Sequence, residues 1–230
     1  MKFKTLLTNL VSLLYPDLCV ICGEPLIENE KYFCFACFFK LPRTNYHFIP
    51  ENQTIERFAG KVSLAKASSY LYYNKGGIAQ KLIAEIKYKG NQNLGIWIGS
   101  YLANDMISSG FFQGIDYLLP VPLHRAKEKK RGFNQAEKLA RGISQVTKIP
   151  LETINIFREK SNTSQTRKGL FDRWMNTRNL FQLKNPDLYN KKHILLIDDV
   201  LTTGSTLEAV TQSLLKSQDV KISILTLAIT

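Results

Sequence analysis

The segment from His193 to Thr206 constrains the fold more than any other part of the chain. Ile194–Ile197 is a continuous apolar run, typical of a strand buried on both faces, and we expect this strand to end at Asp198 and Asp199. Hydroxyl residues around a glycine follow, and then a helix begins. The apolar stripe of that helix consists of Leu207, Val210 and Leu214. A buried strand that leads through a short loop into an amphipathic helix is typical of an α/β sheet.

The loop after this strand has the chemistry of an anion site. Hydroxyl groups, a glycine that admits a close backbone approach and the free N–H groups of a helix start suit a dianionic phosphate. The adjacent carboxylates would repel a phosphate, so we expect them to face sugar hydroxyls or a divalent cation. An ordinary turn followed by a capped helix is the alternative interpretation. The candidate phosphate-binding residues are Thr202, Thr203, Gly204, Ser205 and Thr206.

These residues closely resemble the 5-phosphoribosyl-1-pyrophosphate (PRPP) signature of type I phosphoribosyltransferases. The resemblance implies that Asp198 and Asp199 bind the ribose hydroxyls of PRPP and its Mg²⁺ ion. It also implies that the Thr/Gly/Ser loop binds the 5-phosphate.

The rest of the chain alternates strands with helices. We expect strands at 67–73, 117–121 and 221–229, and helices at 78–87, 94–108 and 134–146. Turns or loops are expected at 74–77 and 87–90. This order predicts an α/β fold in which a mostly parallel sheet carries helices on both faces and binding residues gather at its carboxyl edge.

The net charge points to an anionic partner. The chain carries a formal charge of +12 and has a pI near 9.5. Residues 121–141 contain seven basic and two acidic residues, and residues 158–178 contain six basic and two acidic residues. The first segment follows a predicted strand and is suited to gripping a pyrophosphate, whereas the second is polar and predicts a mobile lid. A solvated charged surface is the alternative for either segment alone.

All four cysteines lie in two Cys-x-x-Cys pairs, Cys19 with Cys22 and Cys34 with Cys37. This spacing predicts one structural zinc ion with four thiolate ligands and no open position for water. Two disulfides are the alternative, but cysteines three residues apart would close strained rings. The aromatic residues around the pairs either stack on nucleobases or form a small core. They are Tyr32, Phe33, Phe35, Phe38 and Phe39.

The chain start and the connector after the cysteines suggest how the domains are arranged. No stretch approaches the roughly 18 apolar residues of a membrane span, so an integral membrane protein is not expected. Met1–Leu14 is expected to form an amphipathic helix docked on the body, with a peripheral membrane contact as the alternative. Prolines at 42 and 50 flank a polar connector, which predicts an N-terminal helix and zinc module at 1–45 and a second domain at 46–230.

The order of these motifs resembles the ComF family of amidophosphoribosyltransferase-like proteins over almost the whole chain. Besides the cysteine pairs and the acidic segment, the resemblance rests on Lys87–Gly90, Pro120–His124, Arg131–Gln135 and Thr163–Gln165. It implies a cytoplasmic bacterial protein with a zinc module and a phosphoribosyltransferase-like domain. The implied role is uptake of single-stranded DNA during natural transformation, with a peripheral position at the inner membrane face.

The resemblance also implies further site residues. The implied pyrophosphate-binding residues are Val121, Pro122, His124 and Arg125. The expected lid, DNA or phosphate contacts are Lys87, Lys89, Lys127, Lys129, Arg131, Asn134, Gln135, Gln165, Arg173 and Asn176. Two departures weaken parts of this assignment. Lys127 and Lys129 replace arginines, which keeps charge but loses bidentate geometry, and Lys168 replaces an apolar residue of the lid.

Two functions from different classes are consistent with these residues. The first is a DNA-handling protein that retains a Mg²⁺–PRPP site, with Phe133 and Trp174 among the aromatic residues that stack on bases. Its expected partners are single-stranded DNA, PRPP and a DNA-uptake helicase or other competence proteins. The second is an active phosphoribosyltransferase that transfers 5-phosphoribose from PRPP to an acceptor. No residue identifies that acceptor.

Overall fold

The computed structural model describes residues 15–158 and 180–230. Its strands are β1 (Lys66–Tyr72), β2 (Tyr117–Pro120), β3 (Ile156–Arg158), β4 (Phe181–Leu183), β5 (His193–Leu201) and β6 (Lys221–Ile229). Its α-helices are α2 (Phe35–Phe39), α3 (Gln53–Glu56), α4 (Ile78–Tyr88), α5 (Gln92–Met106), α6 (Arg125–Arg131), α7 (Gln135–Thr147) and α9 (Ser205–Leu214). Short 3₁₀ helices are η1 (Tyr46–Phe48), η2 (Ile107–Ser109) and η3 (Pro186–Tyr189).

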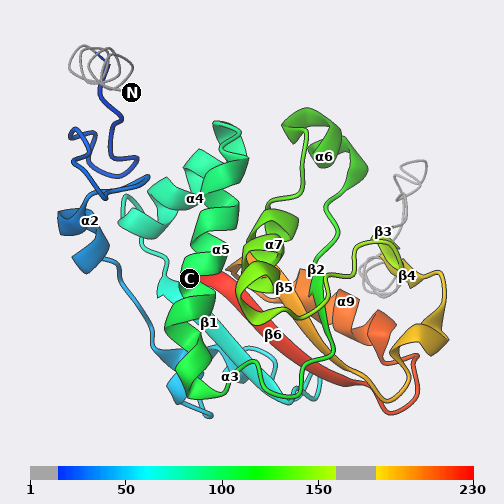
Figure 1. Cartoon of the computed structure of the whole chain (residues 1–230). Coiled ribbons are helices and arrows are strands. Elements are labelled where there is room, and N and C mark those ends of the chain that lie inside the picture. The colour runs from blue at the N-terminus through cyan, green and yellow to red at the C-terminus, as the bar shows by residue number, and fades with distance from the viewer. Residues whose placement is uncertain (1–14, 159–179) are drawn as a thin grey trace.

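The central sheet has four parallel strands in the order β1-β6-β5-β2 (Figure 1). Helices connect successive parallel strands, which is why the sequence alternates the two kinds of element. β3 and β4 form a separate antiparallel pair. The expected parallel α/β architecture is confirmed.

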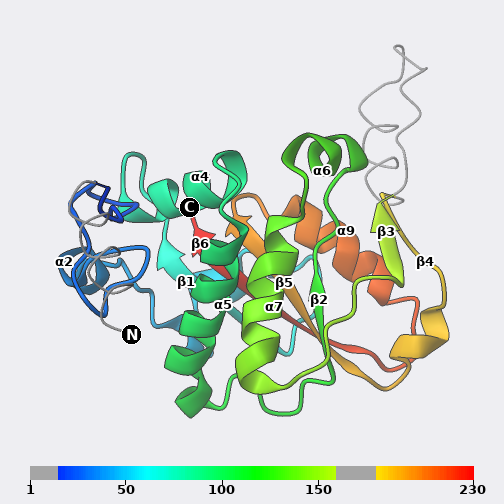
Figure 2. The ribbon, with the colours of Figure 1, turned by 45° about the horizontal axis from the view of Figure 1, so that its top comes forward.

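Each face of the sheet is covered. Leu195 and Ile197 of β5 lie in the same apolar cluster as residues of α5 and α7, whereas Ile194 and Leu196 lie in the cluster that contains the stripe of α9. Figures 1 and 2 show α5 and α7 in front of the strands and α9 behind them. Because successive side chains of a strand point to opposite faces, a run that is apolar at every position is what two covered faces require.

The strand β5 is longer than expected. We expected it to end at Asp198, and this was wrong, because β5 continues to Leu201. β6 runs alongside and pairs Asp198 with Thr226 and Leu201 with Ile229. A long neighbouring strand therefore keeps two acidic residues in extended conformation where their own β-propensity is low.

The helices α5 and α7 approach each other closely at two glycines. A Cβ atom added at Gly99 would collide with the backbone carbonyl of Leu139, and one added at Gly142 would collide with that of Ile96. Ser100 Oγ also donates a hydrogen bond of 3.1 Å to the carbonyl of Gly142. The absence of two side chains therefore allows these helices to form one tight layer over the sheet.

The segment expected to be a connector packs against β1. Thr44 N–H donates to the carbonyl of Tyr70 at 3.0 Å, and Asn52 Nδ2 donates to that of Ala67 at 2.9 Å. Cys19, Phe33 and Cys37 belong to the same apolar cluster as α5. The division at residues 45 and 46 remains a prediction. Within the described ranges, no helix combines the length and apolar character needed to cross a bilayer.

Candidate functional site

The predicted phosphate loop lies between β5 and α9 at the carboxyl edge of the sheet. It forms a small hollow lined by Asp198, Val200 and residues 201–207. The Thr203 and Ser205 hydroxyls are 3.0 Å apart, and Ser205 N–H donates to Thr203 Oγ1 at 3.4 Å. Gly204 caps α9 with a φ of 80°, a left-handed conformation that favours glycine. Hydroxyl groups and the start of a ten-residue helix thus face one hollow, as a phosphate requires.

Two residues that the sequence analysis missed support this loop. A Cβ atom at Gly204 would lie 3.1 Å from Phe58, so that buried ring forms the floor beneath the loop. Arg57 Nη1 donates to the carbonyl of Thr202 at 3.2 Å, and Arg57 also contacts the carbonyl of Thr230. Both residues are more than 140 positions away from the loop in sequence, so no local pattern could have revealed them.

The two carboxyl groups of the acidic pair have different electrostatic surroundings. Lys87 Nζ, on the last turn of α4, lies 2.5 Å from Asp199 Oδ2, and both side chains are largely buried. Among the described residues Asp198 forms no ion pair. Burial and the charge of Asp199 raise the pKa of Asp198, although Asp199 N–H donates to Asp198 Oδ1 at 2.8 Å. A cation or hydroxyl ligand at Asp198 would relieve this repulsion.

The predicted pyrophosphate loop begins beside the acidic strand. Val121 N–H donates to the carbonyl of Ile197 at 2.9 Å, so this N–H group is occupied by sheet pairing. His124 Nδ1 accepts from Ala126 N–H at 3.2 Å and caps α6, while Arg125 is exposed. Val121 therefore positions the loop, and the groups that face solvent belong to the residues after it.

Several predicted contact residues are engaged within the protein. Asn134 is buried, caps α7 through Oδ1, and donates from Nδ2 to the carbonyl of Val121 at 2.9 Å. Gln135 is also buried and accepts from Arg131 Nη1 at 2.9 Å. Lys89 pairs with Glu85 on the same helix. The expectation that Phe133 stacks on bases was wrong, because its ring is only 6% exposed and packs in the core.

The basic segment after β2 forms a helix that we did not expect. α6 places Lys127, Lys130 and Arg131 along a cleft that also contains the end of α4, whereas Lys129 lies outside this lining. We expected residues 87–90 to be a loop, but Lys87 and Tyr88 form the last turn of α4. The predicted contacts Gln165, Arg173 and Asn176 lie outside the described residues, as do Trp174 and the predicted N-terminal helix.

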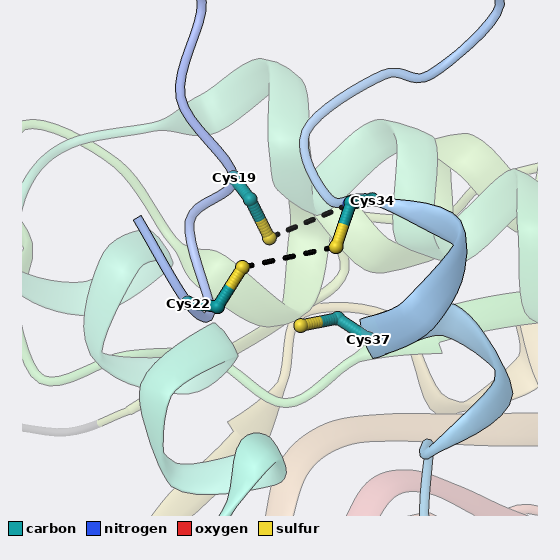
Figure 3. A group of neighbouring side chains, drawn as sticks. All are labelled: Cys19, Cys22, Cys34 and Cys37. Carbon is teal, nitrogen blue, oxygen red and sulfur yellow. Dashed lines mark hydrogen bonds between the residues drawn. The ribbon is translucent and has the colours of Figure 1, made fainter. Parts of the chain in front are cut away.

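The four cysteines meet at one point (Figure 3). Their Sγ atoms all lie within 4.8 Å of one another, and those of Cys22 and Cys34 are 3.7 Å apart. Four thiolates at about 2.3 Å from a tetrahedral ion would be separated by about 3.8 Å, so this cluster could hold a metal ion. Burial opposes ionisation of Cys19, but backbone N–H groups, including that of Cys34, outweigh it and lower the pKa to about 6.

The aromatic residues of the cysteine module are divided between core and surface. Tyr32 and Phe33 contact Trp97 of α5 with ring centroids 5.6 and 5.0 Å apart, and Phe38 contacts Tyr101 at 5.1 Å. Phe35 and Phe39 are 48% and 77% exposed. The first three rings therefore join the module to α5, although Tyr32 and Phe38 are only half-buried, and the last two rings are exposed.

Comparison with known proteins finds one domain family and several relatives. Residues 129–229 match the phosphoribosyl transferase domain. The chain is 24% identical over 219 residues to DNA utilization protein YhgH of Escherichia coli (strain K12), covering 88% of this chain and 92% of that protein. It is 26% identical to competence protein ComFC of Bacillus subtilis, covering 83% of this chain and 81% of that protein. It is 36% identical to competence protein F of Haemophilus influenzae, covering 43% of this chain and 44% of that protein. These matches support the resemblance to the ComF family.

The matched domain covers the acidic pair, the predicted phosphate loop and α9. The cysteine cluster and Lys87 lie before the matched range. The structure nevertheless joins Lys87 to the domain through Asp199. The candidate site is therefore assembled from both the matched and the unmatched parts of the chain.

Proposed function

We propose that this chain is a member of the ComF family that handles incoming single-stranded DNA in the cytoplasm and binds Mg²⁺–PRPP at the carboxyl edge of its sheet. The names of its relatives, which refer to competence and DNA utilization, support the DNA role. One contact carries the proposal. Lys87 pairs with a carboxylate of the PRPP signature and also lines a basic cleft, so a sugar-phosphate site and a polyanion site meet at one side chain.

The proposed PRPP site divides the ligand among three segments. Asp198 and Asp199 accept hydrogen bonds from the ribose hydroxyls, and the hollow of residues 202–206 holds the 5-phosphate on hydroxyl and N–H groups. Pro122, His124 and Arg125 face the pyrophosphate, in a loop held beside β5 by the Val121–Ile197 hydrogen bond. Asp198 also lines the hollow of the 5-phosphate, so a cation bound at its carboxylate would offset the repulsion between that carboxylate and the 5-phosphate.

The donor set fits a magnesium ion. Carboxylate oxygens are ligands that Mg²⁺ prefers, and Asp198 forms no ion pair with any described residue. When bound, the ion would neutralise charge on the pyrophosphate and on Asp198. Asp198 and Asp199 are the residues that would hold it, directly or through water.

The cysteine cluster is proposed to hold a structural zinc ion. Four sulfur ligands from two Cys-x-x-Cys turns match the preferred tetrahedral site and leave no position for a reacting water. The ion would fix two turns that carry Tyr32 and Phe33 onto Trp97. The role of the zinc ion is therefore to stabilise the module on α5. Protein partners such as a DNA-uptake helicase would bind the exposed surface of this module.

The PRPP part is tested by calorimetric titration with Mg²⁺–PRPP. Binding should be lost in the Asp198→Asn/Asp199→Asn variant, because neutral amides replace the two carboxylates that would hold Mg²⁺ and accept charge-assisted hydrogen bonds from the ribose. The matched control is Glu51→Gln/Asp219→Asn, which removes two exposed acidic groups elsewhere and should bind normally. Undiminished binding by the first variant would show that the ribose lies somewhere else.

An active phosphoribosyltransferase is the second candidate function. A cleft of about 190 Å³ adjoins the predicted pyrophosphate loop and is lined by Pro122, Leu123, Arg125, Ile156 and Phe157, among others. Its lining combines apolar side chains with basic and acidic ones, the latter from Glu128 and Glu137, which suits a small acceptor. Pyrophosphate release from Mg²⁺–PRPP in the presence of nucleobases, glutamine or ammonia would support this function. Binding of PRPP without release would favour a regulatory or structural ligand.

A further inference from the structure

A basic cleft lies between the last turn of α4 and the helix α6. Its volume is about 320 Å³, and it is lined by Lys87, Tyr88, Gly90, Lys127, Lys130 and Arg131. Four of these six residues are cationic and none is acidic. Figure 2 shows α4 and α6 at the same end of the molecule.

The spacing of the basic residues on α6 explains why they share this cleft. Lys130 and Arg131 come three and four positions after Lys127, so both lie next to it on the same side of the helix. Within residues 15–158 and 180–230, the ammonium groups of Lys127 and Lys130 form no ion pair, and both side chains are exposed. Two uncompensated charges thus face solvent along the cleft wall.

Tyr88 provides a flat surface inside this basic setting. The residue is 77% exposed, and the guanidinium of Arg131 lies 5.7 Å from the centre of its ring. A cation on one side of an aromatic ring leaves the opposite face for stacking. Exposed aromatic residues are common, but here the ring is combined with several cations and a cleft of molecular size.

We infer that this cleft binds a single-stranded nucleic acid, with one base stacked on Tyr88 and the adjacent phosphates on Lys127, Lys130 and Arg131. The inference rests on the proposed DNA-handling function and assigns its surface. A single strand fits better than a duplex, because the bases of a duplex are stacked on each other and cannot reach a protein ring. The site borders the proposed PRPP site through Lys87, which contacts Asp199.

The stacking part is tested by fluorescence anisotropy of an oligothymidine of about 15 nucleotides, a length suited to such grooves. Tyr88→Ala should weaken binding by about 5- to 150-fold, the loss expected for one stacked base. Tyr88→Phe and Tyr88→Trp should restore it, since both keep a ring. The control is Phe48→Ala, another exposed aromatic residue outside the cleft, which should bind as the wild type does.

The phosphate part is tested by the salt dependence of the same binding. Lys127→Ala/Lys130→Ala should reduce the slope of log affinity against log salt by about 0.7 for each lost contact. Tyr88→Ala should leave that slope unchanged. The matched control is Lys216→Ala/Lys221→Ala, which removes two exposed lysines at the opposite edge of the sheet and should keep the wild-type slope.

The outcomes separate this inference from the proposed function. If the wild type binds the oligonucleotide but neither set of cleft variants weakens binding, the cleft assignment fails and DNA handling stands. Equal losses for single-stranded and duplex DNA in Tyr88→Ala would refute base stacking. A wild type that binds no oligonucleotide at low salt would overturn both. Tyr88-dependent binding of anionic lipid vesicles, without an effect on the oligonucleotide, would assign the cleft to a membrane surface.

Discussion

Asp198 and Asp199 are neighbours in sequence but differ in their electrostatic surroundings. Lys87 neutralises Asp199, whereas burial and the charge of Asp199 raise the pKa of Asp198 from 3.8 to about 7. Between these two pH values the folded chain keeps a proton on Asp198 that the unfolded chain has already released. The stability contribution of this residue therefore falls as the pH rises.

The first prediction concerns Asp198→Asn. Asparagine carries no charge. The free energy of unfolding of this variant should therefore fall less than that of the wild type as the pH rises from about 4 to about 7. At pH values above about 7 it should be more stable than the wild type, although it should bind Mg²⁺–PRPP poorly. Urea unfolding across this pH range measures the difference. Asp219→Asn is the control. If the free energy of unfolding of Asp198→Asn fell with pH as much as that of the wild type, the raised pKa would not belong to Asp198.

A second residue-scale prediction concerns Gly204. Gly204→Ala should reduce the free energy of unfolding by more than the 1–2 kcal/mol or so that a left-handed alanine costs, because its Cβ would also press on Phe58. Gly60→Ala is a matched control, since Gly60 has a φ of 71° but no atom within 4 Å of the added Cβ. Chemical denaturation compares the two. Equal losses of unfolding free energy in Gly204→Ala and Gly60→Ala would show that the Phe58 ring moves aside at no cost.

At the scale of elements, the contact between α5 and α7 depends on residues that lack a side chain. Gly99 and Gly142 each face a backbone carbonyl of the other helix, and backbone atoms cannot move aside as flexible side chains do. Glycine is unfavourable within a helix by about 1 kcal/mol relative to alanine. The close approach of the helices must offset that cost.

The third prediction follows because helix propensity favours alanine at position 99, whereas the contact between α5 and α7 requires glycine. In an isolated helix Gly99→Ala would be stabilising, but in the folded chain it should destabilise by about 1–3 kcal/mol or more, because the two helices must separate. Asn104→Ala on an exposed position of α5 is the control and should change stability little. Thermal and urea unfolding measure both variants. A gain in stability for Gly99→Ala would show that the helices do not meet as described.

At the scale of the whole molecule, the cysteine module is joined to the sheet domain by aromatic contacts. Trp97 contacts Tyr32 and Phe33, and its ring stacks with that of Tyr101 at 5.7 Å. The module has little apolar core apart from these contacts. Metal binding and docking on α5 should therefore be linked.

The fourth prediction uses this linkage. Freshly reduced protein should contain one zinc ion per chain, and Cys34→Ser should lose it. In a Trp174→Phe background Trp97 is the single tryptophan, so its emission should shift to longer wavelength when the metal is removed by a chelator. The sheet domain should retain its own cooperative unfolding transition. Metal-free wild type would instead favour the disulfide alternative, and an unshifted Trp97 would show that docking does not depend on the ion.

The sequence predicted the site best where one segment carried all the information. The loop 202–206, the start of α9 and the sheet strands at 66–72 and 221–229 were recognisable because their signals are local periodicities and turn residues. The α6 helix was missed because its seven residues contain a single apolar residue and show no stripe. Asn134 was read as a contact residue, although an asparagine before an apolar helix is also a typical cap.

By itself, then, the sequence determined the α/β class, the loop between β5 and α9 and the four-cysteine cluster, since each depends on residues close together in the chain. Only the tertiary structure decided that Lys87 pairs with Asp199, that Phe58 and Arg57 support the loop, and that Tyr88 faces the basic residues of α6. These contacts join residues that are 43 to 146 positions apart, and parallel strand order brings them to one edge. Such distances in sequence carry no periodic signal, because the packing of the sheet and its helices alone brings the partners together.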